Sequence, residues 1–463
     1  MAAAVRTREV SPVELTDHYL DRIERLNAQV GAYVTVTAER AREEARRAEK
    51  AVLDAADPAD LPPLHGVPVP IKDLNTVAGV RTTLGSAVFA ETAGRTDDHV
   101  VTKLAQAGSV LLGKTTTPEF GLPCYTESDV APPARTPWDL TRSAGGSSGG
   151  AAAAVASGLA PVAQGSDGGG SIRIPSSACG LFGIKPTRGR VSAGPVSPDL
   201  FGLSTNGPIA RTVRDAALLL DVMAGHMPGD LYRAPRADGP FLAHADRVPG
   251  RLRIARSKES PVPGVEVHPD CAAAYDDASA LLEELGHEVV ELPHVLGADL
   301  LPHFATLWGV LATMTPVPEG SEHLMQPLSR WLREQGEATS APRLLQAHAA
   351  LQGALRAGFP LMDEFDAILH PTLAMPPVPI GYFHEQEPAE NFWRQTQFTP
   401  FCAVYNVSGQ PAVNVPLHWN GDGLPIGVML AGRLGGEGTL ISLSAQLEEA
   451  RPWIGRKPGI WTA

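Results

Sequence analysis

The stretch LAPVAQGSDGGGSIRIP, residues 159–175, places a short apolar run before a loop of glycine and serine. The run at 159–164 predicts a buried strand that leads into the loop. Three consecutive glycines can adopt backbone conformations that are costly for residues with a β-carbon. They can turn several N–H groups toward one point, an arrangement that binds an oxyanion. The three glycines are Gly168, Gly169 and Gly170, and Ser171 follows them at the position a nucleophile would take.

A flexible surface linker would have a similar composition, because glycine and serine are common linker residues. The apolar residues Ile172, Ile174 and Pro175 argue against a linker, since they place the loop in apolar surroundings. Asp167 and Arg173 flank the loop and could brace it as an ion pair. We therefore expect a buried, fixed loop.

A second glycine loop, GGSSGG at residues 145–150, matches the GxSxG pattern of a nucleophile elbow. An elbow needs a hydrophobic strand directly before it, and residues 139–144 are polar and turn-like. Histidines at positions 370, 384 and 418 follow later, so the letters alone leave a serine–acid–histidine triad open. The missing strand speaks against that triad.

A third pattern, GSVLLGKT at residues 108–115, satisfies the letters of a phosphate-binding loop. Its Val-Leu-Leu centre favours a buried strand over a flexible loop, and we expect a strand at 109–112. Thr116, Thr117 and Pro118 follow, which is a poor opening for the helix on which a phosphate would sit. We therefore expect no nucleotide site.

The composition narrows the classes of function. A net charge of -13 repels phosphate backbones, so we expect no nucleic-acid partner. No run approaches the roughly 20 apolar residues of a membrane span, and MAAAVRTREV at the N-terminus lacks a signal-peptide core, so we expect a cytoplasmic protein without a membrane partner. The four cysteines are scattered, and the HExxH-like stretch at His287 has Glu291 in place of the second histidine, so we expect buried thiols and no metal.

Strands and helices alternate along the chain, which predicts an α/β fold with helices on both faces of a large sheet. Ser11-Pro12-Val13-Glu14 is typical of a capped helix start, and Asn420-Gly421-Asp422-Gly423 of a hairpin turn. The expected strands are 67–71, 109–112, 159–164, 252–254, 288–292, 365–369, 413–417 and 426–430. The expected helices are those starting after Ser11 and Thr212, 38–56, 149–158, 272–285 and 439–449, with a mainly helical stretch at 300–360.

Five segments, in order, carry a resemblance to the amidase signature family. They are GVPVPIKDLNTVAGVRTTLGS (66–86), GKTTTPEF (113–120), GGSSGG (145–150), GSDGGGSIRIPSSACGLFGIKPTRG (165–189) and NVSGQPAVNVPLHWNGDGLPIGVMLAG (406–432). The serines at 147 and 171 also lie 24 residues apart, as the family pattern expects. Several long motifs in order are far more specific than either short pattern above.

The resemblance implies a three-layer α/β/α sandwich with a large mixed, mostly parallel central sheet. It also implies a single domain over 1–463: N-terminal helices at 11–56, the signature core at about 64–224, a variable substrate-pocket region at about 226–400, and C-terminal strands and a helix at 401–463. No linker in the sequence is sharp enough to divide the chain.

The resemblance assigns Ser171 as the nucleophile, Lys72 as the base, and Ser147, preceded by a cis peptide bond, as the relay between them. The backbone N–H groups of Gly168, Gly169, Gly170 and Ser171 would form the oxyanion hole. Gly168 departs from relatives that carry a bulkier residue there, but it keeps its N–H donor. A lysine acts as a base only when neutral, and burial behind the apolar strand 67–71 would lower its pKa.

The implied activity is hydrolysis of an amide through an acyl-enzyme, without a cofactor, by a monomer or homodimer. We expect apolar or aryl amides and anilides, with aryl carbamates and esters as further substrates. The residues expected to line the pocket are Phe120, Leu122, Cys124, Tyr125 and Trp308. The alternative within the family is the glutaminase subunit of a tRNA-dependent amidotransferase. A catalytically dead binding protein of the same fold is disfavoured, because Lys72, Ser147 and Ser171 are all present.

Overall fold

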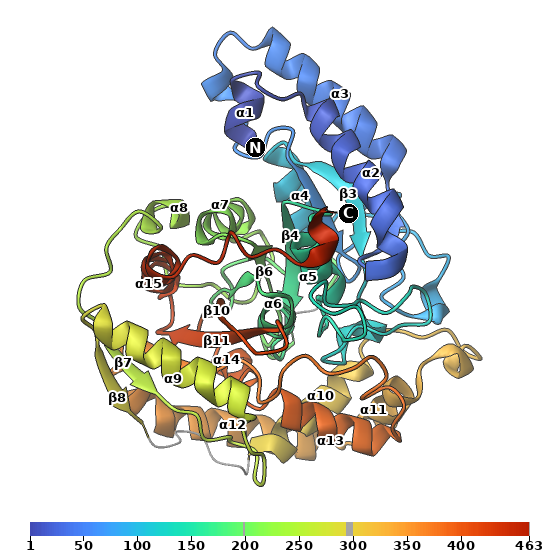
Figure 1. Cartoon of the computed structure of the whole chain (residues 1–463). Helices are drawn as coiled ribbons and strands as arrows, with labels where there is room; N and C mark the ends of the chain where they lie inside the picture. Colours follow the sequence, from blue (N-terminus) through green and yellow to red (C-terminus); the bar gives the residue numbers. More distant parts are fainter. Residues whose placement is uncertain (198–199, 293–299, 463) are drawn as a thin grey trace.

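Eleven strands in two sheets make up the β-structure of residues 1–197, 200–292 and 300–462, which the computed structural model describes (Figure 1). The strands are β1 (Tyr33–Val36), β2 (Pro68–Lys72), β3 (Val110–Thr115), β4 (Val162–Asp167), β5 (Phe182–Lys185), β6 (Thr205–Ala210), β7 (Arg253–Arg256), β8 (Glu288–Glu291), β9 (Ala367–Pro371), β10 (Ala412–Trp419) and β11 (Pro425–Gly432).

Helices connect and cover these strands. The α-helices are α1 (Ala2–Arg6), α2 (Pro12–Val30), α3 (Ala38–Asp54), α4 (His99–Gln106), α5 (Gly149–Ala156), α6 (Arg173–Cys179), α7 (Val213–Met223), α8 (Phe241–His244), α9 (Pro269–Glu284), α10 (Leu300–Ala312), α11 (Pro327–Glu337), α12 (Ala341–Met362), α13 (Pro388–Phe398), α14 (Val404–Val407) and α15 (Glu437–Ala450). Short 3-10 helices are η1 (Pro58–Asp60), η2 (Ala87–Phe89), η3 (Glu119–Gly121), η4 (Glu322–Leu324) and η5 (Gly459–Thr462).

The large sheet has the strand order β4-β6-β5-β10-β11-β9-β7-β8. Its mixed character and the α/β class are confirmed, but the prediction that it is mostly parallel is wrong. Only the pairings of β7 with β9 and β8 are parallel, and the other five are antiparallel. Antiparallel neighbours need no crossover helix, so a short turn can join β10 to β11 at the predicted hairpin.

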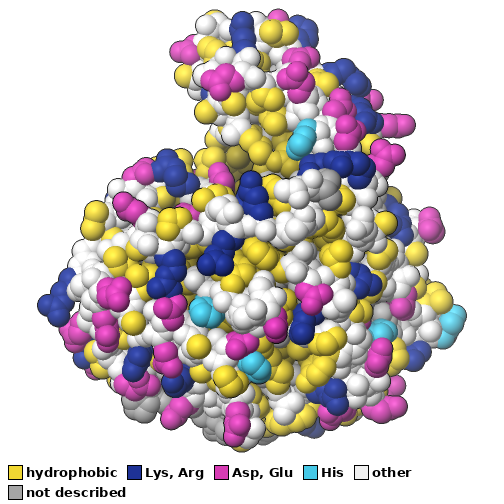
Figure 2. Space-filling model, in the orientation of Figure 1, with side chains coloured by type: hydrophobic (Ala, Val, Ile, Leu, Met, Phe, Trp, Pro, Cys, Tyr) yellow, Lys and Arg dark blue, Asp and Glu magenta, His cyan; other side chains and the backbone are white. Residues whose placement is uncertain are grey.

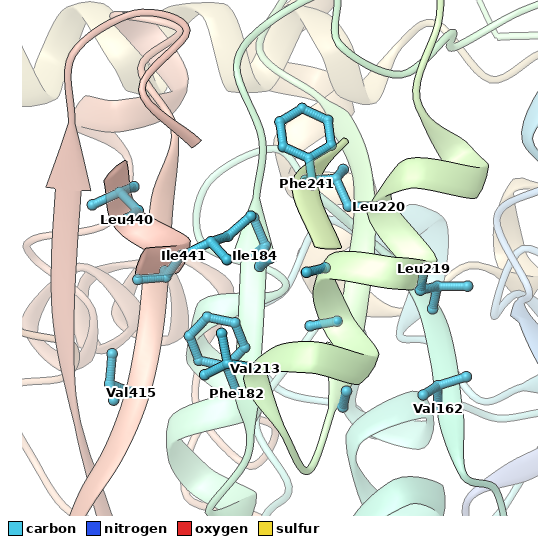
Figure 3. Packing of buried hydrophobic residues seen from close by; sticks show 14 of the residues in the cluster. Val162, Phe182, Ile184, Val213, Leu219, Leu220, Phe241, Val415, Leu440 and Ile441 are labelled. Atoms are coloured by element: carbon cyan, nitrogen blue, oxygen red, sulfur yellow. The ribbon is translucent and has the colours of Figure 1, made fainter. Parts of the chain in front are cut away.

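The two faces of this sheet are covered by different helices, which gives the expected three layers. Along β10, Val413 packs in a cluster with residues of α7, α9 and α15, whereas its neighbour Ala412 packs with residues of α6, α13 and α14. This follows from the period of two in a strand, where successive side chains point to opposite faces. Figure 3 shows part of the cluster that contains Val413, around Phe182, Ile184 and Ile441.

The small sheet, with the order β1-β3-β2, lies next to the helices of the N-terminal region (Figure 1). β2 ends at Lys72 as predicted, and β3 runs through the Gly-Lys-Thr letters of the phosphate-loop pattern, which confirms a strand there. α2 begins with the predicted capping box, in which Ser11 and Glu14 exchange hydrogen bonds with the backbone.

The surface carries mixed charge. Figure 2 shows acidic and basic side chains interspersed over the visible face. Among the helices of the described ranges, none has the length and apolar character needed to cross a membrane. The four cysteines are free and buried, as predicted for the thiols.

Candidate active site

Lys72 lies at the carboxyl end of β2, with its side chain completely buried. Its Nζ donates to Ser147 Oγ at 2.7 Å, to Ser166 Oγ at 3.0 Å and to the Ser166 carbonyl at 3.3 Å. Its backbone N–H donates to Gln164 Oε1 at 2.8 Å, which fixes the end of β2 against β4. Lys72 is therefore held among hydroxyl and carbonyl oxygens rather than beside a carboxylate.

Burial is the main electrostatic influence on Lys72. It lowers the pKa of the ammonium group to about 7, and the Asp167 carboxylate opposes this shift only in part. Near neutral pH a substantial fraction of Lys72 is consequently uncharged, which is the form that can accept a proton.

Ser147 is presented to Lys72 by the second glycine loop. The peptide bond between Gly146 and Ser147 is cis, as the resemblance implied. A β-carbon on Gly146 would lie 2.7 Å from the backbone carbon of Tyr125, so only glycine fits against that segment. Thr117 Oγ1 donates to the Ser147 carbonyl at 3.0 Å and fixes the loop from the other side.

Ser171 follows the glycine run between β4 and α6, and is 7% exposed. The Ser148 N–H donates to its carbonyl at 3.2 Å, which joins the two glycine loops directly. Ser147 and Ser171 line the same cavity. Within the described part of the chain, the Lys72–Ser147 hydrogen bond is formed, but Ser171 Oγ makes no hydrogen bond.

The first glycine loop is braced by the predicted ion pair. Arg173 donates to Asp167 through Nη2 at 2.9 Å and Nε at 3.0 Å, with both side chains fully buried. Asn406 of α14 donates to Asp167 Oδ1 at 2.8 Å and accepts from Arg173 at 2.7 Å. Burial by itself raises the pKa of Asp167. The charge and hydrogen bonds of Arg173, the charge of Lys185 and the hydrogen bond from Asn406 together outweigh burial and hold this pKa well below its usual range. The carboxylate is therefore a permanent charge in the loop.

The same carboxylate changes the expected oxyanion hole. The Gly170 N–H donates to Asp167 Oδ1 at 2.8 Å, so this N–H is already engaged, which corrects the prediction for Gly170. Gly170 instead has a conformational role, because its φ is +128° and a β-carbon would meet Cys402 and Ile174 at 2.7 Å. The N–H groups of Gly168, Gly169 and Ser171 donate no hydrogen bond within the described residues.

Comparison with known proteins gives the family. A model described as Amidase matches residues 14–441. The chain belongs to the amidase family. The AmiB2 protein of Mycobacterium tuberculosis (strain ATCC 25618 / H37Rv) is 43% identical over 454 residues, covering 96% of this chain and 94% of that protein.

Two solved structures have the same fold as this amidase. One is a 6-aminohexanoate cyclic dimer hydrolase complexed with substrate, with a TM-score of 0.91 and 33% identity over 99% of this chain and 98% of that one. The other is a bacterial aryl acylamidase of the amidase signature family, with a TM-score of 0.87 and 26% identity over 98% and 97% of the two chains. The chain is thus an enzyme that hydrolyses amide bonds.

Two cavities of the amidase meet at Ser171. The larger cavity, of about 270 Å³, lies toward Ser147 and has a mixed lining. We call it the polar cavity because the smaller one, of about 100 Å³ and bordered by α10 and α13, is more uniformly apolar. Lining residues of the polar cavity include the polar Asn75, Ser147, Ser166, Ser204, Thr205 and Asn206 and the apolar Leu74, Phe120, Leu200, Leu203, Leu311 and Met314. Lining residues of the apolar cavity include Leu122, Ile174, Val262, Phe304, Trp308 and Phe392.

Four of the five predicted pocket residues line these cavities. Leu122 and Trp308 line both cavities, Phe120 the polar one and Cys124 the apolar one. The prediction for Tyr125 is wrong, since this side chain is 1% exposed, stacks on Phe383 and accepts a hydrogen bond from Asn391. Tyr125 follows the cavity residue Cys124 in the sequence, but its ring packs into the core.

Ser166 and Gln164, the two β4 residues that contact Lys72, were not predicted as site residues. Gln164 and Ser166 are two residues apart in β4, and alternate residues of a strand share one face. This spacing could have indicated that both side chains face Lys72. Asn406 was not predicted either, because its contact with Asp167 joins residues 239 apart in the sequence.

Proposed function

We propose that this amidase cleaves neutral amides carrying an apolar or aryl group, through an acyl-enzyme on Ser171. Aryl carbamates and esters are further substrates in this proposal. The observation that carries it is the buried Lys72, whose pKa is lowered to about 7 and whose Nζ lies 2.7 Å from Ser147 Oγ. A serine hydroxyl is a weak nucleophile and needs such a base nearby.

In the proposed reaction, neutral Lys72 accepts the Ser147 proton while Ser147 takes the proton of Ser171. The Ser171 oxygen attacks the carbonyl carbon, and the carbonyl electron pair moves onto oxygen. Ser147 then returns a proton to the amide nitrogen, the C–N bond breaks, and the amine leaves. Water attacks the acyl-enzyme by the same relay and releases the acid.

The free N–H groups of Gly168, Gly169 and Ser171 would stabilise the oxyanion. They already stand in a loop fixed by Asp167 and Arg173, so they need little reorganisation during the reaction. One such donor contributes about 3 kcal/mol to transition-state stabilisation in a serine hydrolase.

The cavity lining supports an uncharged substrate. Among the described residues that line the polar and apolar cavities, none is Asp, Glu, Lys or Arg. Free glutamine, with its ammonium and carboxylate, would find no opposite charge there, whereas an apolar or aryl amide would displace water from Phe304, Trp308 and Phe392.

The decisive test is Ser171→Ala. We expect turnover of p-nitroanilides to fall by about 10⁴-fold or more, since nucleophile and base act as a unit. Labelling of the wild-type enzyme by a fluorophosphonate probe, located by mass spectrometry, should fall on Ser171 and disappear in the variant. Ser321→Ala, a serine outside both cavities, is the matched control and should keep the wild-type activity. Full activity in folded Ser171→Ala protein would refute the proposal, and preferred hydrolysis of glutamine in a substrate panel would refute its substrate class.

A further inference from the structure

We infer that the acyl part of the substrate binds in the apolar cavity and the leaving amine in the polar cavity, so that the preferred substrates join an apolar acyl group to a neutral, polar amine. This inference rests on the proposed acyl-enzyme at Ser171. Beyond that function, we assign which cavity holds the acyl part of the substrate and which holds the amine part, and therefore the chemical character of each part.

The direction follows from where the returned proton must go. The leaving nitrogen receives its proton from Ser147 as the C–N bond breaks, so this nitrogen must lie on the Ser147 side of Ser171. Ser147 lines the polar cavity and is not among the residues lining the apolar cavity. The amine half therefore extends into the polar cavity, and the acyl half, on the other side of the carbonyl carbon, extends into the apolar one.

The apolar cavity suits an acyl chain or ring. Phe304 and Trp308 of α10 stack with their centroids 5.4 Å apart and form one wall. Besides Ser171, three side chains in the lining carry hydroxyl or amide groups, and two of them are already engaged. Gln395 accepts from the Cys124 N–H and donates to Asn391, and Thr396 donates to the Trp393 carbonyl. The hydroxyl of the third, Thr399, is buried and has no partner among the described residues. A polar acyl group would lose its hydration here without gaining partners from Gln395 or Thr396.

A second apolar space extends the acyl side. This rear cavity, of about 90 Å³, is lined by Pro261, Leu300, Leu351, Leu355, Val404 and Val407 together with five residues shared with the apolar cavity. The shared residues are Val262, Leu301, Phe304, Pro400 and Ala403. Ala403 and Phe304 thus stand where the two spaces meet, and the size of these side chains limits how far an acyl chain can reach.

The polar cavity offers hydrogen-bonding groups to the amine half. Within the described residues, the side-chain hydroxyls of Ser197, Ser204 and Thr315 form no hydrogen bond although they line this cavity. Hydroxyl or amide groups on the leaving amine would find donors and acceptors there.

The experiment uses two series of amides and two opposed variants. In the acyl series the amine is p-nitroaniline and the acyl group is acetyl, butanoyl, hexanoyl or octanoyl. In the amine series the acyl group is butanoyl and the amine is aniline, 4-hydroxyaniline or benzylamine. Ala403→Phe should lower kcat/KM for octanoyl relative to acetyl amides by about tenfold or more, because the added ring fills the passage between the apolar cavity and the rear cavity. Phe304→Ala should raise the same ratio by opening the passage.

Ser204→Phe, which adds the same ring to the polar cavity, is the matched control. It should change the ratios within the amine series and leave the acyl ratios within about threefold. The inference is overturned if Ala403→Phe or Phe304→Ala alters amine preference instead, or if neither alters acyl preference. Should Ala403→Phe fail to fold, Phe304→Ala decides alone, because it removes atoms from a half-buried position. An acyl adduct on Ser171, seen by mass spectrometry after rapid quenching, separates a failure of this inference from a failure of the proposed acyl-enzyme.

Discussion

Lys72 and Lys114 lie on neighbouring parallel strands of the small sheet, and both side chains are completely buried. Their surroundings differ in one respect. Lys114 Nζ forms an ion pair with Asp73 at 2.7 Å, whereas the hydrogen-bond acceptors of Lys72 are the uncharged oxygens of Ser147 and Ser166. Burial lowers the pKa of both lysines, but the adjacent carboxylate of Asp73 raises that of Lys114 again in part.

This difference separates a structural lysine from one suited to proton transfer. A buried charge is tolerated when a hydrogen-bonded opposite charge accompanies it, and the pair then holds two segments together. A buried lysine without such a partner loses its proton more readily and becomes a base. Both lysines are completely buried, so the presence or absence of a paired carboxylate determines which of them is suited to proton transfer.

The largest expected effect comes from Lys72→Arg. Arginine keeps a positive charge at all physiological pH values and cannot serve as a base, so we expect kcat/KM to fall by about 10⁴-fold or more. Steady-state kinetics on p-nitroanilides measure this loss, and circular dichroism checks that the variant is folded. A Lys72→Arg enzyme with near-normal activity would show that the lysine acts as a fixed cation, and the contrast with Lys114 would then disappear.

The structural role of the Lys114–Asp73 ion pair is tested by Lys114→Met. This change leaves the Asp73 carboxylate buried without its counter-ion, so we expect the free energy of unfolding to fall by about 3–5 kcal/mol. Denaturant titration measures the change. The double variant Lys114→Met/Asp73→Asn should recover part of the loss, because the unpaired charge is gone. Equal stability of Lys114→Met and wild type would mean that the pair contributes nothing.

The smallest expected effect is the pH dependence of the wild-type enzyme. The Lys72 pKa is lowered to about 7, and only the neutral form accepts a proton, so kcat/KM should fall about tenfold for each pH unit below that value. The rate should level off above it. The same depressed pKa means that the unfolded chain binds the extra proton between the two pKa values, so this lysine adds stability as pH rises from about 7 toward 10.5. A rate that stays flat well into acid would contradict a neutral-lysine base.

Local sequence patterns determined much of the architecture. The apolar alternation that ends at Lys72 correctly predicted β2, and the Ser11 capping box correctly predicted the start of α2. The turn at Asn420–Gly423 correctly predicted the β10–β11 hairpin. The ordered motifs around Ser147 and Ser171 also indicated the family. These features depend on residues close together in the chain, so the sequence alone carries them.

Contacts between distant segments decided the rest. Whether strands pair parallel or antiparallel depends on how far-apart segments meet, and local patterns do not show it. The burial of Tyr125 against Phe383 and the two cavities that meet at Ser171 bring together segments far apart in the sequence. Gly170 and Asp167 are only three residues apart, but their hydrogen bond depends on the folded conformation of the glycine loop. The sequence does not show the difference between Lys72 and Lys114 either, because the lysine that pairs with Asp73 is Lys114, 41 residues away, and not its sequence neighbour Lys72. Only packing showed which lysine the carboxylate reaches.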